Sequence, residues 1–281
     1  MATLDIRPSP IAGQWYSDDP TELAQSVDHY LAQARLPELP GEVLAVIAPH
    51  AGHVYSGPVA GYAFAAVRGR TPDLVAVISP MHHPYFAPLL TTAHAAYWTP
   101  LGILPVNRSA LADLQAAARE ELGIGLAAVS NDPEHSLEIE LPFLQRALAA
   151  EFELLPVMVH SLDPQISQGL GNALAKVLRG RNFLLVASTD LSHYYDQNTA
   201  LRLDRAMLQA FEAFSPQEAF ELEQRGKGYA CGLGAVTAVL WAARQLGADT
   251  VKILHHATSG DVTGDYRAVV GYGAAAVLKT K

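Results

Sequence analysis

Histidines follow three short apolar runs in this chain, each at the point where the run gives way to a turn. His50 follows Val-Ile-Ala-Pro, His82 and His83 follow Ile-Ser-Pro-Met, and His193 follows Ser-Thr-Asp-Leu-Ser. In an α/β protein such runs are buried strands, and the carboxyl ends of parallel strands carry the binding and catalytic sites. Because imidazole binds zinc, iron and copper and also titrates near neutral pH, we expect a metal or acid–base centre at this edge. Extended backbone would turn only one of His82 and His83 toward it.

Sulfur and carboxylate groups occur in similar positions. Cys231, the only cysteine, lies at the expected start of an apolar helix, where a lowered thiol pKa favours a thiolate ligand or nucleophile. Inert packing is the alternative. Asp190 and His193 would be neighbours on a helical turn, either as an acid–base or metal-binding pair or as a helix cap and a surface histidine. The segment Glu-His-Ser-Leu-Glu that ends at Glu138 allows the same two interpretations, and a helix-entry signal leaves its His135 unexplained.

Strand and helix signals alternate along the chain. Strands are predicted at 43–48, 74–79, 154–160, 183–188, 251–255 and 268–278, and helices at 58–67, 109–122, 138–150, 164–178, 199–214, 216–224 and 230–246. This alternation predicts an α/β fold with a mainly parallel or mixed central sheet, helices on both faces, and a single domain over 1–281. Glycines inside the last strand allow it to be antiparallel or bulged. The Pro-rich, aromatic stretch 81–107 is predicted to be a loop folded over the site.

Composition excludes several classes of protein. Half of the 281 residues are hydrophobic, only 17% are charged, and the formal net charge is −9. The interior is therefore large, and binding to a phosphate backbone is disfavoured. The first residues lack the pattern of a signal peptide, and no apolar run reaches the length of about 18 residues typical of a membrane span. We expect a cytoplasmic protein without a nucleic-acid or membrane partner.

Several short motifs occur in one order along nearly the whole chain. They are Ala-Gly-Gln-Trp-Tyr at Tyr16, Ala-Pro-His-Ala-Gly at His50, Ser-Pro-Met-His-His at His82, Glu-His-Ser-Leu-Glu at His135, Ser-Thr-Asp-Leu-Ser-His at His193, Ala-Cys-Gly at Cys231 and Gly-Tyr-Gly-Ala-Ala at Tyr272. In this the chain resembles the Memo family, whose bacterial members are labelled protein B of the AmmeMemoRadiSam system. The resemblance implies a fold like that of the class III extradiol ring-cleaving dioxygenases, and a radical-SAM protein as a partner.

The resemblance also implies a set of site residues. His50, His82 and Cys231 would bind a mononuclear metal ion, with His193, Asp190 and His135 as the catalytic residues. Fe(II) is the expected ion, with Cu or Zn as alternatives, because a thiolate softens the usual set of two histidines and a carboxylate.

The substrate side is expected to be formed by His53, Tyr55, His83 and Glu138, and His53 stands where the family usually has an aromatic residue. The leading hypothesis is a metal-dependent, dioxygenase-like oxidoreductase acting on an unidentified small molecule or peptide, although a fold does not by itself confer an activity. The alternatives are a non-catalytic adaptor that reuses the cleft, and a metal-free cysteine hydrolase. The acidic charge and the lack of an Arg-rich pocket sequence argue against phosphate recognition by an adaptor.

Overall fold

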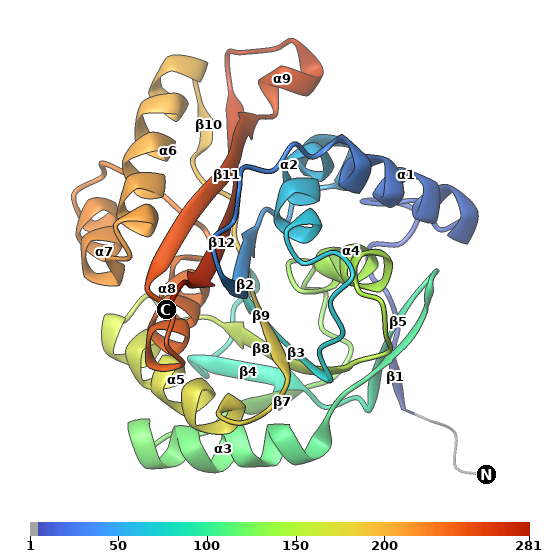
Figure 1. The fold of residues 1–281 in the computed structure, drawn as a ribbon, viewed down its shortest axis with the longest axis vertical. Helices are drawn as coiled ribbons and strands as arrows, with labels where there is room; N and C mark the ends of the chain where they lie inside the picture. The colour runs from blue at the N-terminus through green and yellow to red at the C-terminus, as the bar shows by residue number, and fades with distance from the viewer. Residues whose placement is uncertain (1–4) are drawn as a thin grey trace.

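A nine-stranded mixed sheet runs through the centre of the computed structural model, which describes residues 5–281 (Figure 1). Its order is β10-β12-β2-β9-β3-β8-β4-β7, with β11 paired to β12 outside this path, and β1, β5 and β6 form a second sheet. The strands are β1 (Ile6–Arg7), β2 (Glu42–Ala48), β3 (Leu74–Pro80), β4 (Leu89–Thr92), β5 (Ala96–Thr99), β6 (Gly102–Pro105), β7 (Ala127–Val129), β8 (Glu153–Val159), β9 (Phe183–Ser188), β10 (His193–Tyr195), β11 (Thr250–Thr258) and β12 (Val269–Lys279).

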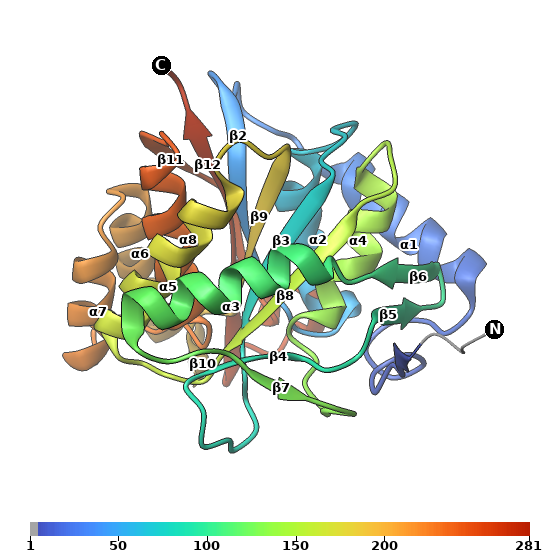
Figure 2. The same ribbon diagram turned by 90° about the horizontal axis from the view of Figure 1, so that it is seen from below.

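Helices cover both faces of the large sheet. They are α1 (Pro20–Gln33), α2 (His53–Ala65), α3 (Arg108–Leu122), α4 (Leu141–Ala147), α5 (Pro164–Leu178), α6 (Gln197–Glu212), α7 (Pro216–Gln224), α8 (Leu233–Gln245) and α9 (Gly260–Thr263), and a 3₁₀ turn, η1 (Glu138–Glu140), precedes α4. Figure 2 shows α3, α5 and α8 on one side of the central strands and α1, α2 and α4 on the other.

The central strands are apolar throughout because both of their faces are buried. In β3, Ala76 and Ile78 belong to the apolar cluster under α3, α5 and α8, whereas Val75 and Val77 belong to the cluster under α1, α2 and α4. Successive side chains of a strand point to opposite faces, so one continuous apolar run supplies both layers. The four strands β2, β9, β3 and β8 are parallel, and they therefore end at one edge of the sheet.

The predicted α/β fold with a mixed, mainly parallel sheet is confirmed, and β12 is antiparallel to both β2 and β11. Gly123 adopts the left-handed conformation that ends α3, and Asp163 caps α5 ahead of its first-turn proline. The predicted loop at 81–107 is wrong, because that stretch contains β4, β5 and β6. Their short, two-sided pairing leaves little periodicity in the sequence to detect.

Two helix boundaries were also predicted incorrectly. The helix predicted at 58–67 begins at His53, and Pro58 lies inside it at the loss of one helical hydrogen bond. The helix predicted at 138–150 is the 3₁₀ turn η1 followed by a short α4. Helix α1 was not predicted from the sequence.

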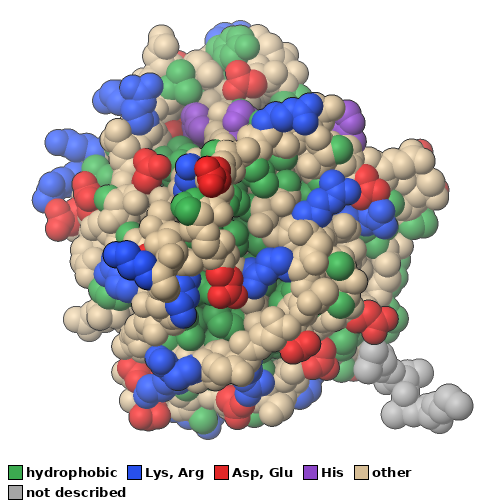
Figure 3. All heavy atoms as spheres, in the orientation of Figure 1, with side chains coloured by type: hydrophobic (Ala, Val, Ile, Leu, Met, Phe, Trp, Pro, Cys, Tyr) green, Lys and Arg blue, Asp and Glu red, His purple; other side chains and the backbone are tan. Residues whose placement is uncertain are grey.

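In residues 5–281, no helix is both long and apolar enough to cross a bilayer. On the face shown in Figure 3, acidic and basic side chains are interspersed.

Candidate metal centre

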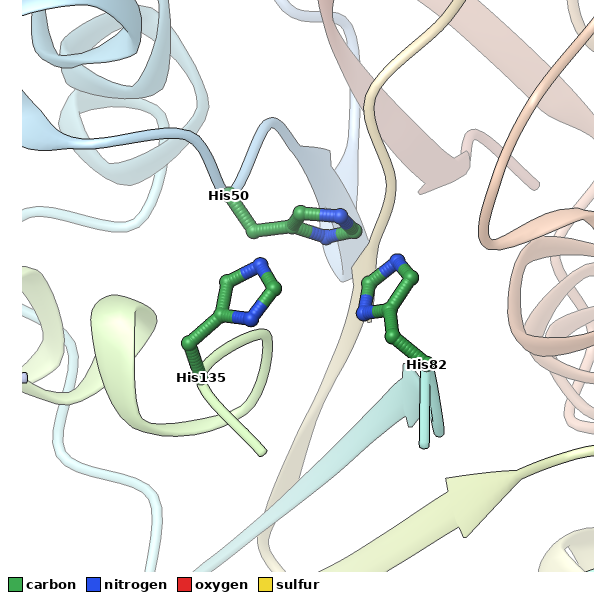
Figure 4. A group of neighbouring side chains, drawn as sticks. All are labelled: His50, His82 and His135. Atoms are coloured by element: carbon green, nitrogen blue, oxygen red, sulfur yellow. The ribbon is translucent and has the colours of Figure 1, made fainter. Parts of the chain in front are cut away.

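Three imidazole rings gather at the carboxyl edge of the parallel strands. His50 follows β2, His82 follows β3, and His135 lies between β7 and η1. Each offers a nitrogen atom, and these three atoms all lie within 4.8 Å of one another. Figure 4 shows the three rings turned toward a common point from three separate segments. His50 is buried and His82 is exposed, so the group is reachable from solvent on one side.

The sheet explains why residues so distant in sequence meet here. Strands β2 and β3 both pair with β9 in parallel, with Ile47 and Ile78 each opposite Ala187. His50 lies two residues beyond the end of β2, and His82 lies two residues beyond the end of β3. The two histidines therefore lie on either side of the chain that leaves β9, with ring centroids 5.2 Å apart. The predicted meeting of these two histidines at the sheet edge is thus what the structure shows.

The carboxylate of Glu134 holds two of the rings. Its Oε1 lies 3.0 Å from Nδ1 of His82 and 3.3 Å from Nδ1 of His135, and it also accepts the backbone N–H of His135 and Ser136. Although burial opposes ionisation, the hydrogen bonds from His82 hold the pKa of Glu134 well below its usual range. An ionised carboxylate can only accept hydrogen bonds, so Nδ1 of His82, which is hydrogen-bonded to it, carries hydrogen.

His50 is held by other groups. Its Nδ1 lies 2.9 Å from Oγ of Ser188, and its backbone N–H donates to Oδ1 of Asp190 at 2.8 Å. Burial, and then the nearby imidazoles of His135 and His82, lower the pKa of His50 well below its ordinary value. Burial also lowers the pKa of His135 to about 4. Both rings are therefore neutral at pH 7, which is the state that binds a metal ion.

Cys231 lies against this group of histidines. Its Sγ is 3.1 Å from Nε2 of His50, and the backbone N–H of Asp190 points to the sulfur at 3.2 Å. Cys231 and His82 also line one small cavity of about 190 Å³. Gly232, the residue before α8, packs so closely on the carbonyl oxygen of Ser188 that a Cβ atom would collide with it. This close packing brings the thiol to the end of β9.

The predicted lowering of the thiol pKa is wrong for the chain by itself. Burial, and then the charge of Asp190, raise the pKa of Cys231 well above its ordinary value. The thiol also precedes the first residue of α8 by two positions, with Gly232 as the N-cap between them. Desolvation of the thiolate therefore outweighs the favourable field of the helix terminus.

Asp190 and His193 do not share a helical turn, as the sequence had suggested. The chain between β9 and β10 is not helical, and His193 begins β10. Nδ1 of His193 lies 2.8 Å from the carbonyl oxygen of Leu191, and its ring lines a hollow of about 210 Å³ together with Cys231. Burial lowers the pKa of His193, and burial raises that of Asp190 to about 7.

Of the four residues expected on the substrate side, Tyr55 lines a cavity of about 570 Å³ that Trp15, Tyr194 and Tyr272 also line. This aromatic cavity adjoins the histidine group, since the ring centroid of Trp15 is 4.1 Å from that of His135. Its lining contains no lysine or arginine. His83 is half-buried beside His82.

The structure does not bring His53 and Glu138 to the aromatic cavity, because both side chains are buried elsewhere. Nε2 of His53 lies 3.0 Å from the carbonyl oxygen of Ile139. Glu138 forms an ion pair with Arg7 at 2.5 Å and accepts the hydroxyl of Tyr16 at 2.6 Å.

Arg7, Glu134 and Ser188 support the site, yet sequence reasoning assigned them no role. The guanidinium of Arg7 is buried and binds Asp132 and the carbonyl oxygen of Glu134, so it holds the segment that carries His135. Glu134 could have been suspected from its position next to a histidine. No local pattern reveals that Arg7 is buried, because its partners lie more than a hundred residues away.

These features define an α/β protein with a histidine-rich candidate metal centre at the carboxyl edge of its parallel strands. Residues 7–276 match the family model described as Memo-like protein. The chain is 32% identical over 273 residues to a MEMO1 family protein of Nitrosopumilus maritimus, covering 96% of this chain and 98% of that one. It is 36% identical over 280 residues to a MEMO1 family protein of Thermotoga neapolitana, covering 95% and 98%. The chain belongs to the Memo-like protein family.

Proposed function

We propose that this protein is a metal-dependent, dioxygenase-like oxidoreductase with a mononuclear centre in which His50, His82 and Cys231 bind the ion. The proposal is carried by the group of His50, His82 and His135, which does not include Cys231, together with Sγ of Cys231 lying 3.1 Å from Nε2 of His50. Two neighbouring ligands of one ion, at about 2.1 Å for nitrogen and about 2.3 Å for sulfur, lie about 3.5 Å apart. His135 is the competing third ligand, because its nitrogen belongs to the same group.

The donor set fits an ion that accepts both imidazole and thiolate. Fe(II) is the ion we propose, with Cu or Zn as alternatives. Bound Fe(II) or Cu would supply one-electron redox chemistry that no side chain of this chain provides. Nδ1 of His50 is hydrogen-bonded to Oγ of Ser188, and Nδ1 of His82 is hydrogen-bonded to Oε1 of Glu134. These contacts support metal binding, because they leave Nε2 of each ring as the atom that can bind the ion.

The surrounding side chains supply proton transfer and substrate binding. The carbonyl oxygen of Leu191 can only accept a hydrogen bond, so His193 carries its hydrogen on Nδ1 and keeps a lone pair on Nε2. His193 lines the same hollow as Cys231, and it is the proton acceptor we propose. The aromatic cavity beside the centre favours a small molecule or peptide side chain with an aromatic or apolar group, because its walls are largely aromatic or apolar; Asp265 also lines it, and no cation does.

Metal content measured on anaerobically purified protein tests this proposal. We expect about one equivalent of Fe or Cu in the wild type, and its loss in His50→Ala and Cys231→Ala. His135→Ala separates the two ligand sets, since it should retain the ion if the sulfur is the third ligand. Equally negligible metal in the wild type and all variants, after reconstitution with each ion, would refute the proposal.

The two alternative functions receive less support. A cysteine hydrolase needs a thiolate, whereas burial raises the pKa of Cys231. An adaptor for phosphorylated peptides needs cations, and none line the aromatic cavity.

We further propose a radical-SAM protein as a partner, and this proposal rests on the family resemblance. Co-purification of the two from one cell extract tests this, and failure to associate at micromolar concentration would refute it.

A further inference from the structure

The hydroxyl group of Ser188 meets three polar groups in the interior beside the candidate metal centre. Its Oγ lies 2.9 Å from Nδ1 of His50, 2.7 Å from the carbonyl oxygen of Ser136 and 2.7 Å from Oε1 of Glu140. Ser188 and Glu140 are fully buried, and His50 is 2% exposed. Water therefore does not compete for these contacts. Each hydrogen in them must come from one of the four groups themselves, which are Ser188, His50, Ser136 and Glu140.

Counting hydrogens at Ser188 fixes the direction of each bond. A serine hydroxyl has one hydrogen to donate and two lone pairs, whereas a backbone carbonyl oxygen can only accept. The hydrogen of Ser188 therefore goes to the carbonyl oxygen of Ser136. The other two partners must then donate to Oγ, so Nδ1 of His50 carries a hydrogen and Glu140 is a neutral carboxylic acid.

We propose that Ser188 is a positioning residue that fixes the His50 ring with hydrogen on Nδ1 and a lone pair on Nε2, and that Glu140 lies beside it as a neutral acid that donates to the same Oγ. The same ring then presents Nε2 to Cys231, whose sulfur lies 3.1 Å away. The assignment of hydrogens rests on the contacts of Ser188 alone. Only its consequence for metal binding rests on the proposed function.

The surroundings of Glu140 support a neutral carboxyl group. Its Oε2 is buried and has no hydrogen-bond partner among residues 5–281. An ionised carboxylate in that position would carry an unpaired charge at a cost of several kcal/mol, whereas the acid form has only one weak acceptor to satisfy. In agreement, burial raises the pKa of Glu140 well above its usual range.

Three variants separate hydrogen donation from simple packing. Glu140→Gln keeps an N–H that can donate to Ser188, Glu140→Leu keeps the volume but cannot donate, and Ser188→Ala removes the hydroxyl group itself. Ser167→Ala is the matched control, because it removes another fully buried serine hydroxyl that has no partner in the part of the chain described.

The primary measurement is long-range ¹⁵N–¹H correlation of the histidine rings in metal-free protein, with His50 assigned by His50→Gln. We expect the Nδ1–H tautomer in the wild type, Glu140→Gln, Glu140→Leu and Ser167→Ala, because in each of them the hydrogen of Ser188 still goes to the carbonyl oxygen of Ser136, and a mixture of tautomers in Ser188→Ala. Zinc titration should show affinity about 10–100-fold weaker in Ser188→Ala, the usual effect of losing a group that orients a ligand. The infrared spectrum of the wild type should contain a protonated-carboxyl band, separate from any band of Asp190, that is lost in Glu140→Gln.

Three results would overturn the proposal: an Nε2–H tautomer of His50 in the wild type, an unchanged tautomer in Ser188→Ala, or no carboxylic acid band that depends on Glu140. If Ser188→Ala fails to fold, the tautomer of the wild type and the infrared spectrum of Glu140→Gln still decide. Zinc binding to none of the proteins would refute the proposed function and leave the tautomer result to judge Ser188.

Discussion

His53 makes the stability of this protein sensitive to acid. Its ring is buried between Phe143 and Tyr16, and burial lowers its pKa to about 4. In the unfolded chain the pKa is about 6.5, so the unfolded state binds the proton first as the pH falls. The stability associated with neutral His53 is complete above pH 6.5 and declines as the pH drops toward 4. The difference between the pKa of His53 in the folded and unfolded states corresponds to a loss of about 3 kcal/mol near pH 4 and about 2 kcal/mol at pH 5.

Replacing His53 by phenylalanine should remove the part of this acid sensitivity that His53 contributes. Urea unfolding at pH 7 and pH 5 gives the loss of unfolding free energy for each protein, and we expect the loss in His53→Phe to be about 2 kcal/mol smaller than in the wild type. At pH 7 the unfolding free energies of His53→Phe and the wild type should differ by no more than about 1.5 kcal/mol, the usual contribution of one hydrogen bond. His29→Gln, at an exposed histidine, should keep the wild-type loss. Equal losses in His53→Phe and the wild type would refute this reasoning.

Three further predictions concern the groups that support the site. Arg7→Met leaves the buried carboxylates of Asp132 and Glu138 without their cation, and should lower the unfolding free energy by about 3–5 kcal/mol in urea; a loss below about 1 kcal/mol would contradict this. Glu134→Ala removes the acceptor on the His82 ring and on the backbone N–H of His135, and should weaken zinc binding about 10–100-fold in a competition titration, whereas unchanged affinity would show that the carboxylate does not orient His82. Gly232→Ala should cost about 1–3 kcal/mol and reduce bound metal, and normal metal content with normal thermal stability would mean that the chain leaving β9 can give way.

The central strands and their order at the site could be predicted because their apolar runs are long and both of their faces are buried. The same runs placed His50 and His82 at one edge, since parallel strands end together. Short strands such as β4 to β6 escaped detection because three or four paired residues give no clear period.

The remaining part of the site depends on contacts that no local pattern encodes. His135 was predicted as a catalytic residue, and its place among the candidate ligands follows from the fold of the segment held by Arg7 and Glu134. The sequence pattern predicts Glu140 to be part of a helix start, and only its burial against Ser188 in the structure indicates another role. Tertiary packing sets the state of such groups, so sequence spacing alone could not predict it.

A crystal structure of the metal-loaded protein, with anomalous diffraction measured at the absorption edge of the ion, tests the central claim most directly. We predict a single strong anomalous peak within about 2.4 Å of Nε2 of both His50 and His82, with Cys231 sulfur at about 2.3 Å. A peak bound by other residues, or no peak from protein shown to contain the ion, would contradict the assignment of these histidines and this cysteine as the metal centre.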